Sequence, residues 1–477
     1  MREVATRCAL AVLCAAMFGL ASPVAWSAVA APIAIVNGTI IDGTGGKPLP
    51  NGVVVISGGR VRAVGPAADI RLPKGTTKID VAGKYVVPGL MDANIHLLID
   101  IEAENLIRYE GRYDDLAVEA AQLELKQGVT TVFDTWGPRE ALVRARQRIN
   151  SGESVGARIF LAGNIIGLGG PFSSDFLPAT NLSQVLVDRI NHAWEQNVGA
   201  DLLLRTPEEV RQRVHDYIAG GDLDFIKYAS SGHRNEQFIA FSPATQRAIV
   251  EEGHAKGLKV LGHSTTVESL RLEVEAGVDV MQHCDITGTE PIPASTLKVI
   301  VERRIACAAM LHTQKHFDWE IAHSSADGAR KSEVWRENDR ALIQAGAVLL
   351  RTTDSGLWGS STATNPIFLP LKNVPDRSNQ MVTAEQLWMQ SAQELGMAPM
   401  DMLLAASRNI AAAYGKLDEI GTLEVGKRAD VVVLNADPLG DYHNYQDIWM
   451  VVKDGQVVDM AHLPTTTILS SPQSAEH

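Results

Sequence analysis

Six polar side chains that could bind metal ions lie at the ends of separate apolar, strand-like runs. The set consists of Asn94 and His96 in VVPGLMDANIH, Lys227 in DFIKYAS, His263 in KVLGHS, His283 in DVMQHC and Asp354 in VLLRTTDS. Imidazole and carboxylate groups are ligands of Zn²⁺ and similar divalent ions. Because an eight-stranded α/β barrel builds its active site at its strand ends, separate strands could bring these side chains to one metal centre.

Each of these residues also has an ordinary structural interpretation. A lone His263 or His283 could be a hydrogen-bonded core residue. Lys227 could be a strand-end lysine in an ion pair, and Asp354 could cap a helix. The ordered set favours ligation, because both histidines close predicted strands and TTDSG closes another. The sequence therefore predicts a metal centre in which Asp354 and Lys227 also take part in catalysis.

Strand-like and helical segments alternate along the middle of the chain, which is typical of βα units and a parallel sheet. Helical stretches such as 243–257 (PATQRAIVEEGHAKG) carry apolar residues at helical spacing and end in glycine. The predicted strands are 84–91, 129–134, 157–162, 224–230, 259–264, 279–284, 305–311 and 347–353. Eight such strands predict an α/β fold with a closed (β/α)₈ TIM barrel.

The two ends of the chain have a different pattern from its middle. Short runs with alternating apolar residues, such as IAIVNGTIID and ADVVVLNA, are separated by turn signals and predict antiparallel strands. We expect residues 32–83 and 410–465 to form one composite β-sandwich domain, with the barrel at 84–409. The final residues, 466–477, are polar and are expected to be disordered.

The N-terminus has the pattern of a cleavable signal peptide. Arg2 and Arg7 flank the start of an apolar stretch at 8–20, and small residues follow. Residues 1–31 are therefore predicted to direct export, which makes the mature protein periplasmic or secreted. No later segment is apolar enough to cross a bilayer, so we expect no membrane association after cleavage. Cys284 and Cys307 either pair or are two buried apolar residues.

The composition is that of a globular protein, with 45% hydrophobic and 21% charged residues. A formal net charge of −13 argues against nucleic acid as a partner. We expect a small-molecule substrate and a homo-oligomeric assembly.

Several of these motifs resemble those of one enzyme family. VVPGLMDANIH resembles the barrel-opening PGLIDxHxH motif of the amidohydrolase superfamily, and DFIKYASSG resembles its metal-bridging lysine strand. KVLGHS, AGVDVMQHC and TTDSG resemble its two single-histidine strands and its catalytic aspartate strand. IGTLEVGKRADVVVLNADPL resembles the segment that returns to its small sandwich domain. The chain is most similar to the imidazolonepropionase-like group, which includes metal-dependent prolidases and ochratoxinase-type amidases.

This resemblance implies a centre with one or two divalent metals, with Zn²⁺ expected. His96, Lys227 and Asp354 would hold an inner ion, and Lys227, His263 and His283 an outer one. Lys227 would react with CO₂ to give a carbamate, since an ammonium cannot bind a cation. A metal-activated hydroxide would attack the carbonyl, with Asp354 as general base and then general acid.

Asn94 departs from the family pattern, which has histidine at this position. A neutral amide oxygen binds Zn²⁺ less strongly than imidazole does. The inner site is therefore expected to be weakened, coordinated through the Asn94 carbonyl, or empty. A centre with two metals and one with only the outer metal are both compatible with the sequence.

The predicted reaction is hydrolysis of a C–N bond in an amide or peptide, such as an N-acyl amino acid, a dipeptide or an aryl amide. The alternatives are an ester, lactone or carbamate hydrolase on the same centre, or a non-catalytic metal- or ligand-binding barrel. Substrate specificity lies in loops that the motifs do not cover. The candidates for substrate contact are His233, Arg234, His312, Lys315 and Trp358.

Overall fold

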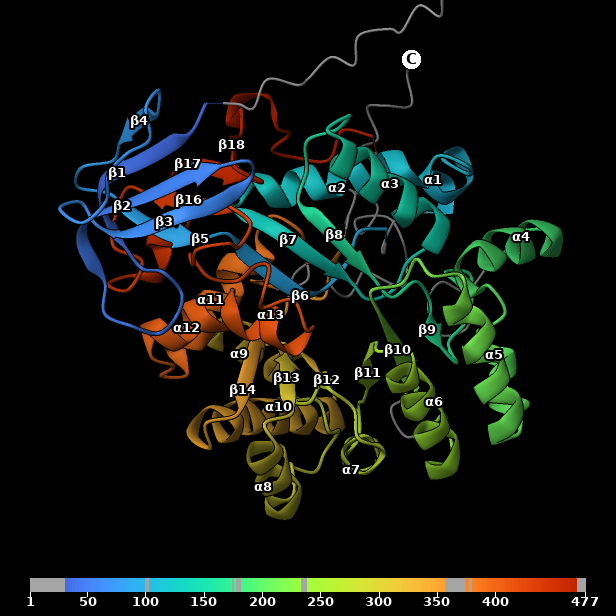
Figure 1. Ribbon diagram of the computed structural model, residues 1–477. Coiled ribbons are helices and arrows are strands. Elements are labelled where there is room, and N and C mark those ends of the chain that lie inside the picture. The colour runs from blue at the N-terminus through green and yellow to red at the C-terminus, as the bar shows by residue number, and fades with distance from the viewer. Residues whose placement is uncertain are drawn as a thin grey trace, which may run out of the picture.

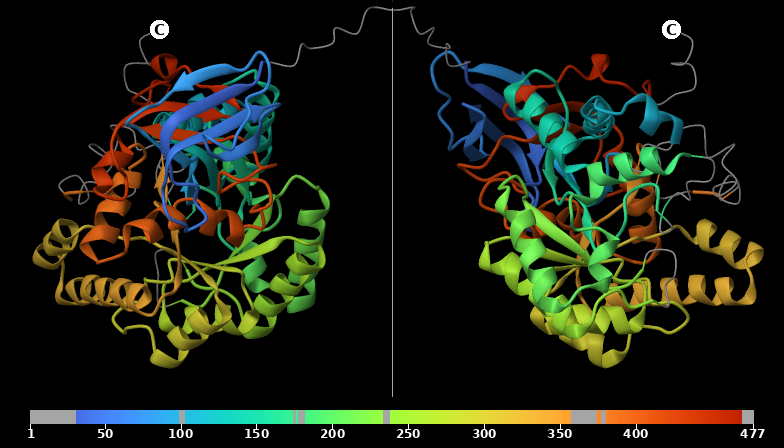
Figure 2. Two further views of the ribbon diagram at one scale, coloured as in Figure 1. Left: turned by 60° about the vertical axis from the view of Figure 1, so that its left-hand side comes forward. Right: turned by 90° about the vertical axis from the view of Figure 1, so that its right-hand side faces the viewer.

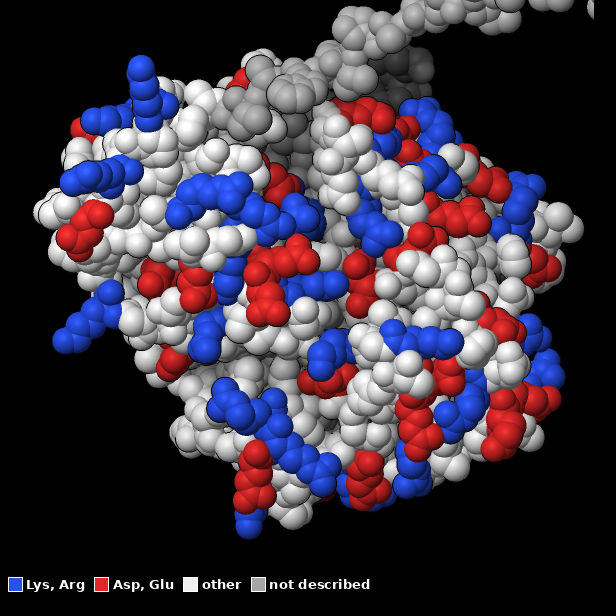
Figure 3. Space-filling view, viewed as in Figure 1, with Lys and Arg blue, Asp and Glu red and all other residues white. Residues whose placement is uncertain are grey.

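The computed structural model describes residues 31–98, 103–173, 176, 182–232, 238–356, 374–376 and 380–469. The predicted signal peptide lies outside these residues except for Ala31. Within the described part of the chain, no helix is both long and apolar enough to cross a membrane. Basic and acidic side chains are interspersed on the face seen in Figure 3.

Strands from both ends of the chain pair in one eight-stranded sheet, drawn in blue and red in Figure 1. Its order is β18-β17-β16-β5-β1-β2-β3, and β4 pairs with β1. The strands are β1 (Ile33–Ile40), β2 (Leu49–Ser57), β3 (Arg60–Pro66), β4 (Thr77–Asp80), β5 (Tyr85–Pro88), β16 (Val431–Leu434), β17 (Ile448–Lys453) and β18 (Gln456–Val457). The composite of both chain ends is thus present as one mixed sheet, and the two-layer sandwich stays a prediction.

The core of this sheet follows from the alternation in its sequence, because successive side chains point to opposite faces. Ile35 and Val54 belong to one apolar cluster, whereas their neighbours Ala34 and Val53 belong to another. Both faces of the sheet are therefore covered by apolar contacts.

The middle of the chain forms two sheets in which all neighbouring strands are parallel. One has the order β14-β13-β12-β11-β10-β9, and the other has the order β15-β6-β7-β8. Their strands are β6 (Leu90–His96), β7 (Val129–Asp134), β8 (Arg158–Leu161), β9 (Ile165–Ile166), β10 (Phe225–Ala229), β11 (Lys259–His263), β12 (Val280–Gln282), β13 (Ala306–Ala309), β14 (Val348–Arg351) and β15 (Ser355–Gly356). The prediction of an α/β fold with parallel strands is confirmed.

Backbone hydrogen bonds link the two parallel sheets. The Asp224 N–H donates to the Leu161 carbonyl (3.0 Å), and the Asp354 N–H donates to the Asn94 carbonyl (2.8 Å). The closed eight-stranded barrel stays a prediction.

The first predicted barrel strand, 84–91, is in fact two strands in different sheets. β5 pairs with β16 of the chain-end sheet, and β6 starts the parallel sheet after Gly89. A Cβ atom at Gly89 would lie 2.1 Å from Thr130 Oγ1, so only glycine lets the chain pass there. The apolar run continues through this position, which is why its pattern predicted one strand.

Helices lie along the outside of the parallel strands, as the views in Figures 1 and 2 show for α5 to α8. They are α1 (Ala103–Arg108), α2 (Tyr113–Lys126), α3 (Arg139–Ser151), α4 (Gln184–Glu195), α5 (Pro207–Ala219), α6 (Pro243–Ala255), α7 (Val267–Ala276), α8 (Ala294–Arg303), α9 (Gln314–His323), α10 (Ala326–Gln344), α11 (Ala384–Glu394), α12 (Pro399–Ala405) and α13 (Arg408–Ala413). Short 3₁₀ helices are η1 (Ala200–Leu204), η4 (Tyr442–Tyr445) and η5 (Met460–His462). Thr206 and Glu209 form a capping box at the start of α5, with Pro207 in its first turn.

A buried ion pair joins the parallel strands to the chain-end sheet. Arg158 on β8 is 4% exposed and donates to Asp430 (Nη1–Oδ2 2.6 Å) and Asp454 (Nη2–Oδ1 2.5 Å). Asp430 Oδ1 also accepts the Asp454 backbone N–H at 2.8 Å. These contacts fix the position of β8 against the loops that flank β16 and β17.

The end of the chain corrects one prediction. Residues 466–469 were expected to be disordered, but the structure describes them and they contact α2. The Ile468 and Leu469 N–H groups donate to Glu119 (2.7 and 3.1 Å), and Tyr109 Oη donates to the Leu469 carbonyl. These bonds join backbone groups to a carboxylate on α2, so a pattern of polar residues in the tail itself could not reveal them. Residues 470–477 lie outside the described part.

Candidate metal centre

The carboxyl ends of the parallel strands place the six predicted ligands on one side of the fold. His96 ends β6, His263 ends β11 and His283 directly follows β12. Lys227 lies within β10, and Asp354 lies between β14 and β15. Except for Asp354, which is partly exposed, these side chains and that of Asn94 on β6 are buried.

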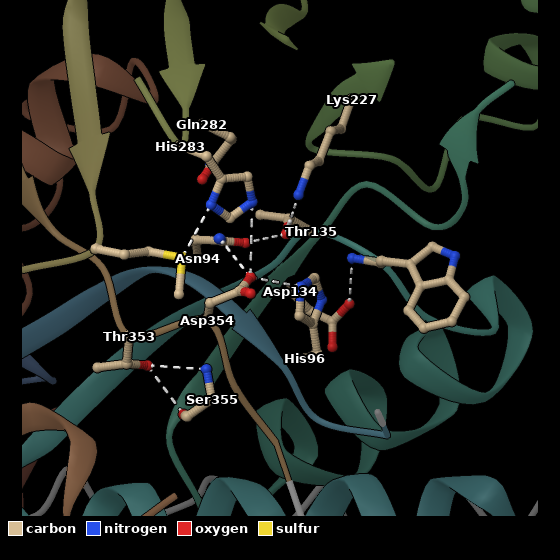
Figure 4. Close-up of polar contacts among 12 residues, drawn as sticks. Asn94, His96, Asp134, Thr135, Lys227, Gln282, His283, Thr353, Asp354 and Ser355 are labelled. Atoms are coloured by element: carbon tan, nitrogen blue, oxygen red, sulfur yellow. Dashed lines mark hydrogen bonds and ion pairs between the residues drawn. The ribbon is translucent and has the colours of Figure 1, made fainter. Parts of the chain in front are cut away.

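Three of these side chains converge on one oxygen atom. Asp354 Oδ1 accepts the Asn94 amide N–H at 2.8 Å and lies 3.0 Å from His96 Nε2. His283 Nε2 lies 3.9 Å from the same oxygen. Figure 4 shows Asn94 and His96 of β6, and His283 after β12, pointing toward Asp354. The structure thus brings Asn94, His96, His283 and Asp354 together, and their roles as metal ligands stay a prediction.

The backbone is strained at two of these residues. His283 has φ 60° and Asp354 has φ 52°, a left-handed conformation that is uncommon for residues other than glycine. The His283 N–H donates to the Ala308 carbonyl at 3.1 Å, and the Asp354 N–H donates to Asn94. Such strain persists where surrounding contacts over-determine it, and it clusters at functional sites.

His263 lies beside His283 rather than at Asp354. Their rings are 4.7 Å apart between centroids, with the edge of one facing the other. On its other side, His283 Nδ1 lies 3.0 Å from Met310 Sδ. The two histidines predicted for an outer metal are therefore neighbours, as that assignment requires.

Lys227 reaches the centre through a residue that the sequence did not single out. Its Nζ donates to Thr135 Oγ1 at 3.1 Å, and the Thr135 hydroxyl donates to Asn94 Oδ1. Burial lowers the pKa of Lys227 to about 8, and the carboxyl groups of Asp354 and Asp134 only partly oppose this. A lowered pKa increases the fraction of neutral amine, which is the form that reacts with CO₂.

Two further carboxyl groups near Lys227 were also missed. Asp134 Oδ2 accepts the Leu97 N–H (2.8 Å), and burial raises the pKa of Asp134 to about 8. Burial likewise raises the pKa of Glu273, on α7, well above its usual range. Glu273 occupies space that Gly262 leaves free, since a Cβ at Gly262 would lie 2.2 Å from its Cδ. The run TTVFDTW places Asp134 and Thr135 at a strand end and could have indicated them, but nothing in the sequence marks Glu273.

A third missed carboxyl group, that of Asp92, supports the segments that carry Asn94 and Asp354. Its Oδ1 accepts the Asn94 N–H at 2.9 Å, and its Oδ2 accepts the Thr353 hydroxyl. Burial raises the pKa of Asp92 to about 7.

The electrostatics suit a divalent cation. Burial lowers the pKa of His96, so its imidazole is neutral at pH 7 and has a lone pair for a metal. Burial alone would raise the pKa of Asp354, but His283 and His96 hold it well below its usual range. Asp354 is therefore an anion.

The imidazoles and this carboxylate fit Zn²⁺ in type. Among the described residues, the His, Cys, Asp and Glu side chains do not form a group of three or more in ligand geometry.

The predicted substrate contacts lie outside this cluster or outside the described residues. His312 is buried, its Nδ1–H donates to the Met310 carbonyl (2.6 Å), and burial lowers its pKa to about 3. Lys315 pairs with Asp376 at 3.0 Å and is largely exposed. His233, Arg234 and Trp358 lie outside the described residues. Cys284 and Cys307 are both buried and neither is in a disulfide.

An aromatic wall, formed by Trp136, Phe176 and Trp194, stands next to His96 and was also missed. The Trp136 and His96 rings meet edge to face, and their centroids are 6.1 Å apart. Trp136 stacks on Phe176 at 3.9 Å and lies 6.4 Å from Trp194. Its Nε1–H donates to Asn164 Oδ1 at 2.8 Å, which fixes the indole.

Comparison with known proteins identifies the family. Residues 85–460 match the amidohydrolase family. Phenylurea hydrolase B, a solved structure, is 38% identical, with 92% of this chain and 99% of that chain covered and a TM-score of 0.85. Molinate hydrolase, also solved, is 36% identical, with 93% and 97% covered and a TM-score of 0.84. Ochratoxinase from Aspergillus niger is 25% identical over 433 residues, which cover 87% of this chain and 83% of the relative.

The resemblance seen in the motifs is thus confirmed. The family and these hydrolase relatives indicate an enzyme that hydrolyses C–N bonds. The chain belongs to the amidohydrolase family.

Proposed function

We propose that this protein is a metal-dependent hydrolase that cleaves a C–N bond next to a carbonyl group in a small organic molecule. The observation that carries the proposal is the convergence of Asn94, His96 and His283 on Asp354 Oδ1. A carboxylate held among imidazoles at strand ends has the composition of a metal-assisted hydrolytic site.

His263, His283 and a carboxylated Lys227 would hold a first, outer ion, and His96, Asp354 and Lys227 would hold the inner one. Zn²⁺ is the expected metal, and when bound it supplies Lewis-acid catalysis toward the substrate carbonyl. In the orientation described here, Asn94 presents its amide N–H rather than its oxygen to Asp354. A second, inner ion would therefore be held more weakly than the first.

Asp354 performs the proton transfers in this proposal. Its low pKa keeps it ionised at neutral pH, so it can accept a proton from the attacking water. Its carboxyl group then donates that proton to the leaving nitrogen. The side chain is 20% exposed, whereas that of His96 is 4% exposed, so Asp354 is the more accessible of the two to substrate and water.

The proposed substrate is a urea or a related carbonyl compound with an aryl or other apolar group on nitrogen. The similarity to phenylurea hydrolase B and molinate hydrolase supports this class. The buried aromatic wall beside His96 makes that side of the centre apolar, which suits an apolar substituent. Dipeptides, N-acyl amino acids, esters, lactones and carbamates are alternatives on the same centre, and a non-catalytic binding protein is the alternative of a different class.

Three further proposals concern architecture, location and assembly, and the family supports the first of them. The two parallel sheets are proposed to form one (β/α)₈ barrel, with the chain-end sheet as a small β-sandwich domain. The N-terminal pattern supports export to the periplasm or the medium. We further propose a homo-oligomer.

A substrate panel tests this function. Purified protein loaded with Zn²⁺ is incubated with phenylureas, molinate, N-acyl amino acids and Xaa-Pro dipeptides, and the released amines are quantified. The proposal expects release of an amine or aniline from at least one urea-like compound at a higher kcat/KM than from any peptide. Preferential cleavage of dipeptides would reject the substrate class, and no turnover of any compound would favour the binding protein.

A further inference from the structure

Four side chains form a continuous hydrogen-bonded chain across the centre. Lys227 Nζ donates to Thr135 Oγ1 (3.1 Å), and the Thr135 hydroxyl donates to Asn94 Oδ1. The Asn94 amide N–H donates to Asp354 Oδ1 at 2.8 Å. Figure 4 shows this chain of contacts running from Lys227 to Asp354.

The direction of every bond in the chain follows from its two ends. An ammonium can only donate and a carboxylate can only accept. Thr135 must therefore accept from Lys227 and has its one hydroxyl hydrogen left for Asn94. With its oxygen turned to Thr135, Asn94 presents its N–H₂ to Asp354.

Burial leaves little freedom for other partners. Lys227 is 1% exposed, and Thr135 and Asn94 are fully buried. The Thr135 backbone N–H donates to the Ile95 carbonyl at 3.1 Å, which fixes the residue between β7 and β6. A change at Lys227 must therefore be met by reorientation of the hydroxyl and the amide.

We propose that Thr135 is a positioning residue whose hydroxyl sets which end of the Asn94 amide faces Asp354, according to whether Lys227 is an ammonium or a carbamate. The inference rests on the proposed function, because it assigns a role to Thr135 in assembling that metal centre.

Carboxylation reverses the chain of hydrogen bonds. The neutral Lys227 amine attacks the carbon of CO₂, an N–C bond forms, one C=O electron pair moves to oxygen, and the amine proton leaves to solvent. The product is an anion with oxygen acceptors in place of the ammonium donors. Thr135 then donates to the carbamate and accepts from the Asn94 N–H₂, so that Asn94 Oδ1 turns toward Asp354.

Two oxygens that face each other repel unless a cation lies between them. A divalent cation bound at Asp354 therefore favours the reversed orientation of the Asn94 amide. Without the cation, repulsion between the two oxygens disfavours that orientation. By linkage, CO₂ raises the affinity for the cation, and the cation stabilises the carbamate to the same extent. The state of Lys227 therefore determines the orientation of the Asn94 amide through the Thr135 hydroxyl.

Zn²⁺ affinity measured by competition with a chromophoric chelator, with and without bicarbonate, tests the coupling. The Thr135→Ser variant keeps the hydroxyl, and Thr135→Val removes it at nearly the same volume. We expect bicarbonate to tighten Zn²⁺ binding in all three proteins, because the carbamate is itself a proposed ligand. The effect is expected to be about tenfold larger in the wild type and in Thr135→Ser than in Thr135→Val, the size of the one charge-assisted hydrogen bond that the missing hydroxyl would transmit.

A second readout separates loss of coupling from loss of the carbamate. ¹³C-labelled bicarbonate gives an NMR signal for the Lys227 carbamate, which is expected in all three proteins. The full bicarbonate effect in Thr135→Val, or none in the wild type, overturns the inference. If Thr135→Val does not fold by circular dichroism, Thr135→Ala takes its place with the same expected result. Normal bicarbonate coupling in a wild type that hydrolyses no compound supports the inference and rejects the proposed function.

Discussion

Asn94 and Asp354 are joined twice, although 260 positions separate them in the sequence. The Asn94 backbone carbonyl accepts the Asp354 N–H at 2.8 Å, and the Asn94 side-chain amide donates to Asp354 Oδ1 at 2.8 Å. This pair links β6 to the segment after β14 and holds Asp354 in its left-handed conformation. The residue that departs from the family motif is therefore part of what orients the predicted general base.

Replacing Asp354 with asparagine is expected to remove turnover and keep the metal. An amide can offer an oxygen to a cation but cannot accept the proton of the attacking water, and loss of one general base costs about 10²–10⁴ in rate. Steady-state kcat and metal content by atomic emission test this together. Asp69→Asn, an exposed change in the loop between β3 and β4, is the control and should leave both values unchanged. A near wild-type kcat in Asp354→Asn would exclude the residue as the base.

Replacing Asn94 with histidine is expected to raise the amount of bound metal. The wild-type amide offers its N–H to Asp354, whereas imidazole offers a lone pair to a cation. Titration with Zn²⁺ should show two tightly bound ions in Asn94→His and one tightly bound ion in the wild type. Two equally tight ions in the wild type would contradict the assigned weakness of the inner position.

Burial of the protonated Lys227 is expected to lower the free energy of unfolding below pH 8. Its folded-state pKa of about 8 lies below the usual 10.5, so the folded protein loses its proton first as the pH rises. From pH 8 to 10.5 the unfolded chain binds more protons, and wild-type stability rises relative to a Lys227→Met variant by up to roughly 3 kcal/mol.

Denaturant unfolding of both metal-free proteins at pH 7 and pH 10, in buffers depleted of CO₂, measures this change. The difference in the free energy of unfolding should shift toward the wild type at the higher pH. A difference that stays constant across this range would show that the lysine is not desolvated.

Breaking the Arg158–Asp430 pair is expected to destabilise the fold without altering the site. Asp430→Ala leaves Arg158 buried with the more exposed Asp454 as its remaining carboxylate, which costs about 3–5 kcal/mol. Glu153→Ala removes an exposed partner of Arg148 and should cost no more than about 1 kcal/mol. Urea unfolding compares the two, and equal midpoints would mean that the buried pair does not join the sheets.

The strand ends could be predicted because apolar runs and their terminal polar residues are local features of the sequence. This applied to His96, His263, His283 and Asp354. Thr135 and Glu273 were not predicted, because threonine and glutamate are common residue types whose role depends on the packing around them. For Glu273 that packing is the space which Gly262 leaves beside α7.

The orientation of the Asn94 side-chain amide likewise could not be predicted from the sequence. It depends on hydrogen bonds to Thr135 and Asp354, which lie on other segments of the chain. The motif could show that a histidine was replaced, but the three-dimensional contacts show which atoms the replacement presents.

Metal dependence of hydrolysis is the most direct test of the proposed function. Protein stripped with a chelator and dialysed into metal-free buffer is assayed on the best urea-like substrate, before and after stoichiometric Zn²⁺ is added. The account predicts that activity disappears on stripping and returns in proportion to the Zn²⁺ bound, and that Asp354→Asn binds the ion without regaining activity. Undiminished hydrolysis by the stripped protein, with no metal detectable, would contradict it.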